Sequence, residues 1–288
     1  MLRPIANPEN PRLPPELERA IFETSALSHL PGIPTLMRVA WRVKEWVEPL
    51  MYRVVMVSGA SPRKMLGFPI FREYILPLVV ENKPSEFFQD NVKHLFLESA
   101  PDQAATEALL TACSHIISLV LLMRDPSPYM SMLASMECLQ RLSVQVEALF
   151  PGRDIDFIHP LFRNVTHLEI FHHFQSSQMA EFYPGLALVP NLTHVAFHSG
   201  FHRVEALSTE ADSHVKCLVY LTAVELSNTP AALNDPRIVC IQLQSPIRAR
   251  WLRGVDKGED FWALADSFIA AKRVGKVPRK PLCILATS

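Results

Sequence analysis

Two short stretches of the sequence are rich in side chains that could bind a metal ion or contact a partner. Residues 165–173 read VTHLEIFHH, and residues 192–198 read LTHVAFH. Imidazole and carboxylate groups are acceptable zinc ligands, and a zinc site here could draw on His167, Glu169, His194 and His198. Four ligands on a shallow surface of strands rarely converge into a tetrahedron, and the chain contains no HExxH helix motif. We therefore expect no metal here, which leaves solvated polar side chains or contacts with a partner.

Both stretches belong to a pattern that repeats along the chain. The spacing apolar-x-x-apolar-x-apolar occurs seven times, with central anchors at Leu95, Leu119, Leu142, Leu168, Val195, Leu218 and Ile241. The anchors return roughly every 24 residues, as in repeat proteins. The sixth copy also fits when it is shifted by three residues onto LVYLTA, residues 218–223. Alternating apolar residues predict short strands with one buried face, and the helix-like residues between them indicate that these strands run parallel.

This repeat resembles a leucine-rich repeat over roughly residues 50 to 245. The resemblance implies an α/β solenoid with a parallel sheet on its concave side, helices on its convex side and a helical cap at each end. The asparagine that usually follows the last anchor of such repeats is missing. The loops must then satisfy their backbone groups in another way, and we expect a degenerate variant of the repeat.

The register of the repeat predicts which side chains share the concave face. His94, His167 and His194 each stand directly before an anchor, so His167 and His194 are expected side by side on neighbouring strands. We expect this face to be free for contact with a protein partner. The candidate partner-binding residues are His94, Phe96, Arg141, His167, Glu169, Phe171, His194 and His198.

Composition narrows the classes of function. The chain has 288 residues and a formal net charge of −1, so nothing draws it to nucleic acid or to an anionic membrane. The N-terminus has no apolar signal core, and the five cysteines form no CxxC pair, which indicates a reducing compartment and buried free thiols. We expect a cytoplasmic or nuclear protein. No GxSxG, GxGxxG or GxxxxGK motif is present, and we predict no enzymatic activity, no catalytic residues and no cofactor.

Residues 13–52 predict two helices that precede the repeat. Pro14 and Pro15 open the first helix, residues 29–34 break the pattern, and residues 35–47 form the second helix until Glu48 and Pro49 end it. This segment resembles an F-box, most closely the F-box-like segments of mushroom-forming fungi. The resembling residues are Leu13, Pro14, Pro15, Glu16, Leu17, Ile21, Phe22, Val39, Trp46, Pro49, Leu50 and Tyr52.

The F-box resemblance implies a substrate receptor of a cullin-type ubiquitin ligase. The helices would then bind a Skp-type adaptor protein, and the repeats would hold a substrate protein whose identity is unknown. The resemblance assigns adaptor binding to Leu13, Pro15, Leu17, Ile21 and Phe22. The alternative is a stand-alone repeat scaffold that binds a protein partner, in which the N-terminal helices only cap the first strand.

We divide the chain into a flexible N-terminus (residues 1–12), an F-box-like helical segment (13–52), a repeat region (53–250) and a C-terminal capping helix with its tail (251–288). The sequence EDFWALADSFIAAKRV, residues 259–274, has the apolar periodicity of a helix and is expected to fold over the last strand. The short apolar end ILATS can add an edge strand to the sheet.

Overall fold

The computed structural model describes residues 13–59, 68–72, 75–99, 102–171, 179–198, 214–223, 235–276 and 284–286. The N-terminus that we expected to be flexible, residues 1–12, lies outside the described residues. Among the described residues, no helix combines the length and the apolar character needed to span a bilayer.

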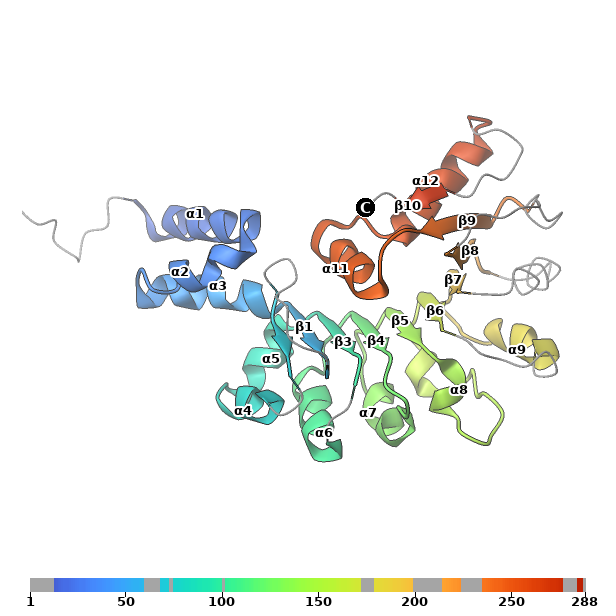
Figure 1. Ribbon diagram of the computed structural model, residues 1–288, viewed down its shortest axis with the longest axis horizontal. Helices are drawn as coiled ribbons and strands as arrows, with labels where there is room; N and C mark the ends of the chain where they lie inside the picture. Colours follow the sequence, from blue (N-terminus) through green and yellow to red (C-terminus); the bar gives the residue numbers. More distant parts are fainter. Residues whose placement is uncertain are drawn as a thin grey trace, which may run out of the picture.

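A ten-stranded sheet runs through the molecule, and every neighbouring pair of its strands is parallel (Figure 1). The predicted α/β class with a parallel sheet is therefore confirmed. The order of the strands is β10-β9-β8-β7-β6-β5-β4-β3-β1-β2. Their bounds are β1 Val54–Val57, β2 Ile70–Phe71, β3 His94–Leu97, β4 Ser118–Leu121, β5 Arg141–Val144, β6 His167–Ile170, β7 His194–Phe197, β8 Cys217–Thr222, β9 Ile238–Leu243 and β10 Ile284–Ala286.

The anchor column forms as predicted from β3 to β8. The paired residues are Leu95, Leu119, Leu142, Leu168, Val195 and Leu218. The seventh anchor was wrong, because Leu218 pairs with Ile238 whereas Ile241 pairs with Leu221. All six residues of β8 are buried, so this strand presents apolar side chains on both faces of the sheet. A shift by an odd number of residues moves a side chain to the opposite face, which is why Ile238 and not Ile241 continues the column.

Short helices cover one face of the sheet. They are α4 Leu76–Glu81, α5 Ser85–Asn91, α6 Gln103–Ala112, α7 Met130–Ala134, α8 Val146–Leu149 and α9 Met179–Leu186. Asp102 caps α6 by accepting a hydrogen bond from the backbone N–H of Ala105 at 3.3 Å. The anchors and these helices share one buried apolar cluster that extends from Val55 to Cys240. We call this side of the sheet the helix-side face and the opposite side the concave face.

The N-terminal segment is helical from Pro15 to Tyr52, as α1 Pro15–Ser28, α2 Ile33–Leu36 and α3 Trp41–Tyr52, with a 3-10 turn at Leu30–Gly32. The predicted second helix is thus divided in two, and its predicted end at Pro49 was wrong because α3 continues to Tyr52. Proline removes one hydrogen bond of the helix, but aromatic packing holds this last turn. The Tyr52 ring contacts Phe87 and Phe88, with centroids 5.3 and 5.9 Å away.

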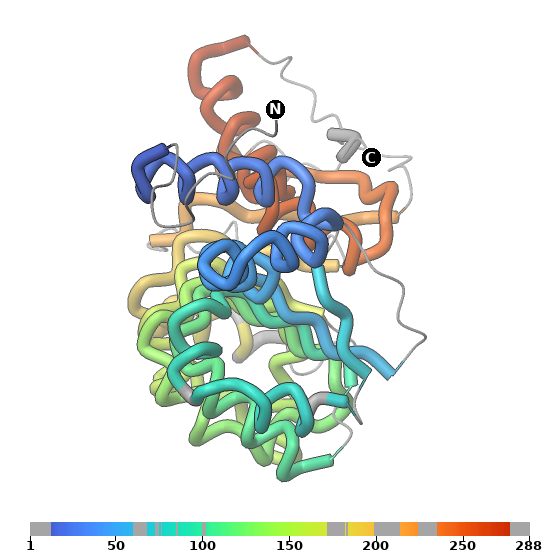
Figure 2. The backbone as a smooth tube through the Cα atoms, turned by 90° about the vertical axis from the view of Figure 1, so that its left-hand side faces the viewer, coloured from blue at the N-terminus to red at the C-terminus, as the bar shows by residue number. Residues whose placement is uncertain are grey.

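The C-terminal segment crosses the concave face. It contains α11 Ile247–Lys257 and α12 Phe261–Arg273, and Figure 2 shows this segment (orange to red) on the side of the sheet opposite α4–α7 (teal to green). Gly258 ends α11 in the left-handed conformation with φ of 70°, which glycine adopts without strain. The predicted helix at 259–274 is confirmed as α12, and it contacts β8 and β9. The α11 helix was not predicted, and our boundary at residue 250 falls inside it. The predicted edge strand is confirmed as β10, which pairs with β9.

The expectation that the cysteines are buried free thiols was only partly correct. Cys113 and Cys217 are free and buried, whereas Cys138 is free but exposed. Cys240 takes part in a disulfide, and Cys283 lies outside the described residues. A disulfide depends on the distance between two thiols in space, which the spacing of cysteines along this chain does not reveal.

Candidate functional site

The side chains that we expected to be free on the concave face contact the chain's own C-terminal helices. The register brings His94, Ser118, Arg141, His167 and His194 into one column across five neighbouring strands, as predicted. Trp251 of α11 contacts His94 and Ser118, and Trp262 of α12 contacts His167 and His194, so both helices lie over this column. The expectation of an open surface was therefore wrong, and the reason is a helix that the repeat pattern did not include.

Glu169 is the most heavily partnered of these side chains. It is 4% exposed, and its Oε1 accepts a hydrogen bond from Arg250 at 2.8 Å, while its Oε2 accepts one from Ser143 at 2.7 Å. His198 Nε2 lies 2.7 Å from Oε1. Burial by itself raises the pKa of Glu169, but the His198 hydrogen bond and the Arg250 charge outweigh it and lower the pKa to about 2. This ionised carboxylate is engaged on both oxygens and buried under α11, so it is not accessible to a protein partner.

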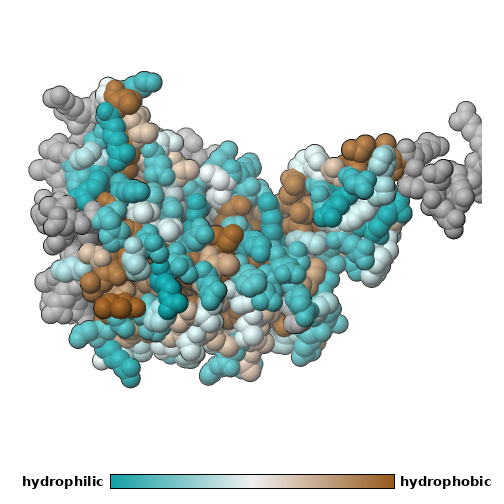
Figure 3. Space-filling view, turned by 180° about the vertical axis from the view of Figure 1, so that it is seen from behind, coloured by the Kyte–Doolittle hydropathy of each residue, from teal (hydrophilic) through white to brown (hydrophobic). Residues whose placement is uncertain are grey.

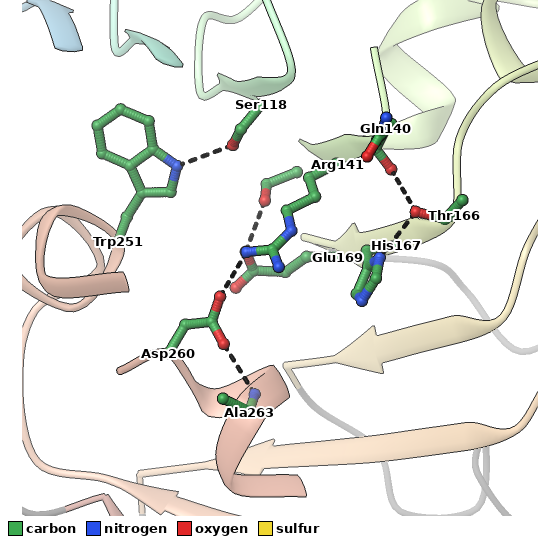
Figure 4. A network of polar contacts seen from close by, with 10 residues as sticks. Ser118, Gln140, Arg141, Thr166, His167, Glu169, Trp251, Asp260 and Ala263 are labelled. Atoms are coloured by element: carbon green, nitrogen blue, oxygen red, sulfur yellow. Dashed lines mark hydrogen bonds and ion pairs between the residues drawn. The ribbon is translucent and has the colours of Figure 1, made fainter. Parts of the chain in front are cut away.

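Arg141 joins the sheet to the start of α12. Its Nη1 donates to Asp260 Oδ2 at 2.6 Å, and Asp260 Oδ1 accepts from the backbone N–H of Ala263 at 2.8 Å (Figure 4). One carboxylate therefore caps α12 and binds the sheet. Gly254 allows this close approach, because a Cβ on it would lie only 2.6 Å from the Asp260 Cβ.

His167 and His194 lie side by side, as the register predicted. Their rings are stacked with centroids 4.1 Å apart, and the Trp262 ring of α12 meets both edge-on at 5.2 and 5.8 Å. The Thr166 and Thr193 hydroxyls lie 2.8 and 2.7 Å from the Nδ1 atoms of their neighbouring histidines and fix the two rings. Burial lowers the pKa of His167 to about 3, with smaller effects from His194 and Arg141, so His167 is neutral at physiological pH.

The other predicted residues lie at the two margins of the polar region. Phe96 is 1% exposed beneath Trp251, with ring centroids 5.2 Å apart, and His94 meets the same indole edge-on at 6.5 Å. Burial and the nearby positive charges of Arg53, Arg141 and Lys93 lower the pKa of His94 to about 4. Phe171 is half-buried, and its ring centroid lies 4.9 Å from that of His198.

Little space remains between the sheet and the two helices. A cavity of about 30 Å³ is lined by Ser118, Arg141, Ser143, Glu169, Arg250, Trp251, Gly254, Val255, Asp260, Phe261 and Trp262. This volume suits a water molecule or two but is far smaller than the sites that hold small-molecule substrates. The polar network therefore joins parts of the protein and does not form a substrate pocket.

The residues proposed for adaptor binding lie at the other end of the molecule. Leu17 and Ile21 are each 54% exposed and lie one turn apart on the same face of α1, and Leu13, which is 43% exposed, precedes the helix. Pro15 is also exposed, whereas Phe22 is half-buried and its ring centroid lies 6.4 Å from that of Trp46. Apolar side chains are visible on the surface of this end of the molecule (Figure 3). We call Leu13, Leu17 and Ile21 the α1 stripe.

Sequence reasoning missed two groups of residues. The first is the set of charged α11 residues that hold this helix to the sheet: Arg248 pairs with Glu98, Arg250 with Glu169, and Asp256 with Arg53. A signal for this helix existed in Ile247, Trp251 and Val255, which recur at helical spacing and pack on the concave face. The second group, His194, Cys217 and Asp266, brings metal-ligand atoms within 4.8 Å of one another.

The comparisons with known proteins identify no relative. No family model, no curated protein and no solved structure matches the chain. Fold and site together define an α/β protein whose parallel sheet carries polar side chains beneath its own C-terminal helices.

Proposed function

We propose that this chain is a non-catalytic protein-interaction module that acts as an F-box-like substrate receptor of a cullin-type ubiquitin ligase. The N-terminal helices recruit a Skp-type adaptor, and a leucine-rich-repeat-like solenoid carries the substrate protein. The observation that carries the proposal is the α1 stripe, a row of large aliphatic side chains that the chain leaves in contact with water. Burying such a side chain is worth about 1.5–3 kcal/mol, so a row of them is a favourable surface for a partner.

The opposite face of α1 supports this division of roles. Ala26 is fully buried, and Phe22 packs against Trp46 in the same cluster. The helix is therefore held to α3 by one face while the stripe faces away from it. A receptor of this kind does no bond chemistry; it raises the local concentration of its substrate near the conjugating enzyme.

The repeat region supports a solenoid through its connectivity. From β3 to β9 the strands follow in chain order, every pair is parallel, and the α4–α9 helices all lie on one side (Figure 1). Each strand with its helix leaves an apolar face that only its neighbours cover, which is how repeat arrays gain stability.

The covered concave face restricts where a substrate protein can bind. Phe96 and Glu169 are buried, so neither is accessible to a substrate protein in this conformation. Arg141, Phe171 and His198 keep part of their surface in solvent at the margin of α11 and α12. We place the substrate contact along this margin.

The alternative function, a stand-alone repeat scaffold, is favoured by a different observation. Ile33, Val43 and Val47 of the N-terminal helices share one buried cluster with Val54 and Met56 of β1. This continuity suits helices that close the end of a sheet. Both functions use the same packing, and they differ only in whether the α1 stripe binds an adaptor.

A capture experiment separates the two functions. The Leu17→Asp/Ile21→Asp variant places charges on the stripe, and the control Leu188→Asp makes the same kind of change at a residue that is 55% exposed elsewhere. We expect the double variant to lose capture of a purified Skp-type adaptor by about tenfold or more, since central interface anchors carry most of the affinity. Leu188→Asp should bind as the unmodified chain does.

The thermal midpoint of each variant completes the experiment. Substitution of exposed side chains away from special contacts changes stability by only about 0.5 kcal/mol, so both variants should melt near the unmodified chain. Equal capture by the double variant and the control, or unfolding of the double variant alone, would overturn the receptor function and favour the cap.

A further inference from the structure

Three potential metal ligands meet where α12 lies on the concave face. His194 comes from β7, Cys217 from β8 and Asp266 from α12, and their ligand atoms all lie within 4.8 Å of one another. They supply a nitrogen, a sulfur and an oxygen. This combination differs from the set that the sequence suggested, which is His167, Glu169, His194 and His198. In that set Glu169 already binds Arg250 and Ser143.

The fold fixes the positions of all three ligands. The β7–β8 register pairs His194 directly with Cys217, so both side chains leave the sheet at the same level. Asp266 follows Trp262 by four residues, one helical turn, and the Trp262 ring is held against both stacked histidines. The packing of this indole therefore aims the Asp266 carboxylate at the same point.

The orientation of the side chains matches what a metal requires. Thr193 Oγ1 lies 2.7 Å from His194 Nδ1, which leaves Nε2 directed at Asp266 Oδ1, 3.0 Å away. Such a hydrogen bond to the remote ring nitrogen typically orients a metal-bound histidine. Cys217 is fully buried and is not in a disulfide, whereas Asp266 is 59% exposed and keeps the cluster accessible from solvent.

We propose that His194 Nε2, Cys217 Sγ and an Asp266 carboxylate oxygen bind one zinc ion, with water as the fourth ligand. Nitrogen, thiolate and carboxylate ligands are those of zinc, and bond lengths of about 2.0–2.3 Å imply ligand atoms roughly 3.5 Å apart in a tetrahedron. The three ligand atoms lie within 4.8 Å of one another, so small rotations of the side chains bring them to this size. The Cys217 thiol loses its proton to solvent as its sulfur binds the metal.

The thiol distinguishes this cluster from an ordinary surface ion pair. A histidine and an aspartate at 3.0 Å form a common contact that needs no third group. Here a fully buried thiol lies close to the same carboxylate. A divalent cation between these groups compensates both the carboxylate and the thiolate, and it fastens α12 to the sheet.

Cobalt is the probe for this site, because cobalt replaces zinc and its bond to a thiolate absorbs in the near ultraviolet. The chain carries the Cys138→Ser substitution, which removes the exposed free thiol, and is treated with a chelator before titration. We expect one equivalent of cobalt to bind with the thiolate band and to be displaced by zinc. Cys217→Ser should abolish the band, and Asp266→Asn should weaken cobalt binding by about tenfold or more.

The matched control is Glu259→Gln, which neutralises another exposed acid close to the start of α12. This variant should bind cobalt as its parent does, and added zinc should raise the melting temperature of both by more than that of Asp266→Asn. If Cys217→Ser fails to fold, the two carboxylate variants decide the question. Cobalt binding without a thiolate band, or equal affinities of Asp266→Asn and Glu259→Gln, would overturn the zinc site. Adaptor capture does not depend on this result.

Discussion

The two faces of the sheet differ in how they are held. On the helix-side face, aliphatic anchors from successive strands form one continuous apolar cluster with α4–α9. On the concave face, apolar clusters occur at the two ends, and paired polar side chains of β4–β7 lie between them. One face is stabilised by buried apolar area, whereas at the centre of the other face matched charges position the covering helices.

The two faces therefore contribute differently to the stability of the fold and to the position of α11 and α12. Each buried leucine of the helix-side face contributes about 1.5–3 kcal/mol, and these contributions do not depend on the identity of a single partner. A buried ion pair is near neutral relative to a well-packed apolar pair, but loss of one member is strongly unfavourable. The concave network therefore adds little net stability, but it fixes the position of α11 and α12 on the sheet.

The largest effect is expected on the helix-side face. Leu168→Ala removes a fully buried anchor whose neighbours in the column are Leu142 and Val195. The lost burial and the remaining cavity should lower the free energy of unfolding by about 2–5 kcal/mol, measured by chemical denaturation. Leu188→Ala, at an exposed leucine, should change it by no more than about 0.5 kcal/mol. A loss below 1 kcal/mol at Leu168 would contradict a continuous core on this face.

A smaller effect is expected in the concave network. Arg250→Met leaves the buried Glu169 carboxylate with only Ser143 and His198, and the free energy of unfolding should fall by about 3 kcal/mol. Arg141→Met is the matched control. The Arg141 side chain is 41% exposed beside Asp260, so its removal should be worth about 1 kcal/mol or less.

A double variant distinguishes charge matching from packing. Adding Glu169→Gln to Arg250→Met removes the carboxylate that the first substitution left without its arginine. Denaturation should then show that most of the lost stability returns. If the double variant is less stable than Arg250→Met, the two side chains stabilise the protein by more than their charges, and the contrast between the faces is weaker than we state.

The two faces also differ in how far the sequence predicts them. The apolar pattern of the helix-side face recurs in every repeat unit. The anchors, the parallel direction of the strands and the pairing of His167 with His194 therefore follow from spacing alone. The register error at Ile241 arose because β8 is apolar on both faces, and alternation then no longer selects between two pairings.

The cover of the concave face could not be predicted from the repeat. Its contacts join residues far apart in the chain, such as Glu98 with Arg248, and no periodic pattern links them. The sequence showed polar side chains on an outward column, and the helical spacing of Ile247, Trp251 and Val255 did not reveal that this helix returns to cover them. Asp266 was missed for the same reason, although His194 and Cys217 already shared a column.

The pH dependence of stability tests the concave face with the smallest expected effect. In the unfolded chain His94 takes up a proton near pH 6.5, whereas in the folded chain its pKa is lowered to about 4. The unfolded state thus binds more protons between these values, and stability falls as the pH drops below 6.5. One pH unit below this value should lower the free energy of unfolding by about 1.4 kcal/mol through this histidine, measured by denaturation at pH 7 and 5.5.

His94→Gln should reduce this loss, because glutamine cannot take up the proton, whereas His29→Gln at an exposed position should keep it. Burial is the largest cause of the lowered pKa, and the Trp251 ring of α11 lies against the His94 imidazole. The acid sensitivity therefore reports how tightly α11 covers the sheet. If His94→Gln and His29→Gln lose stability equally on acidification, His94 is hydrated in solution and the concave face is more open than its contacts indicate.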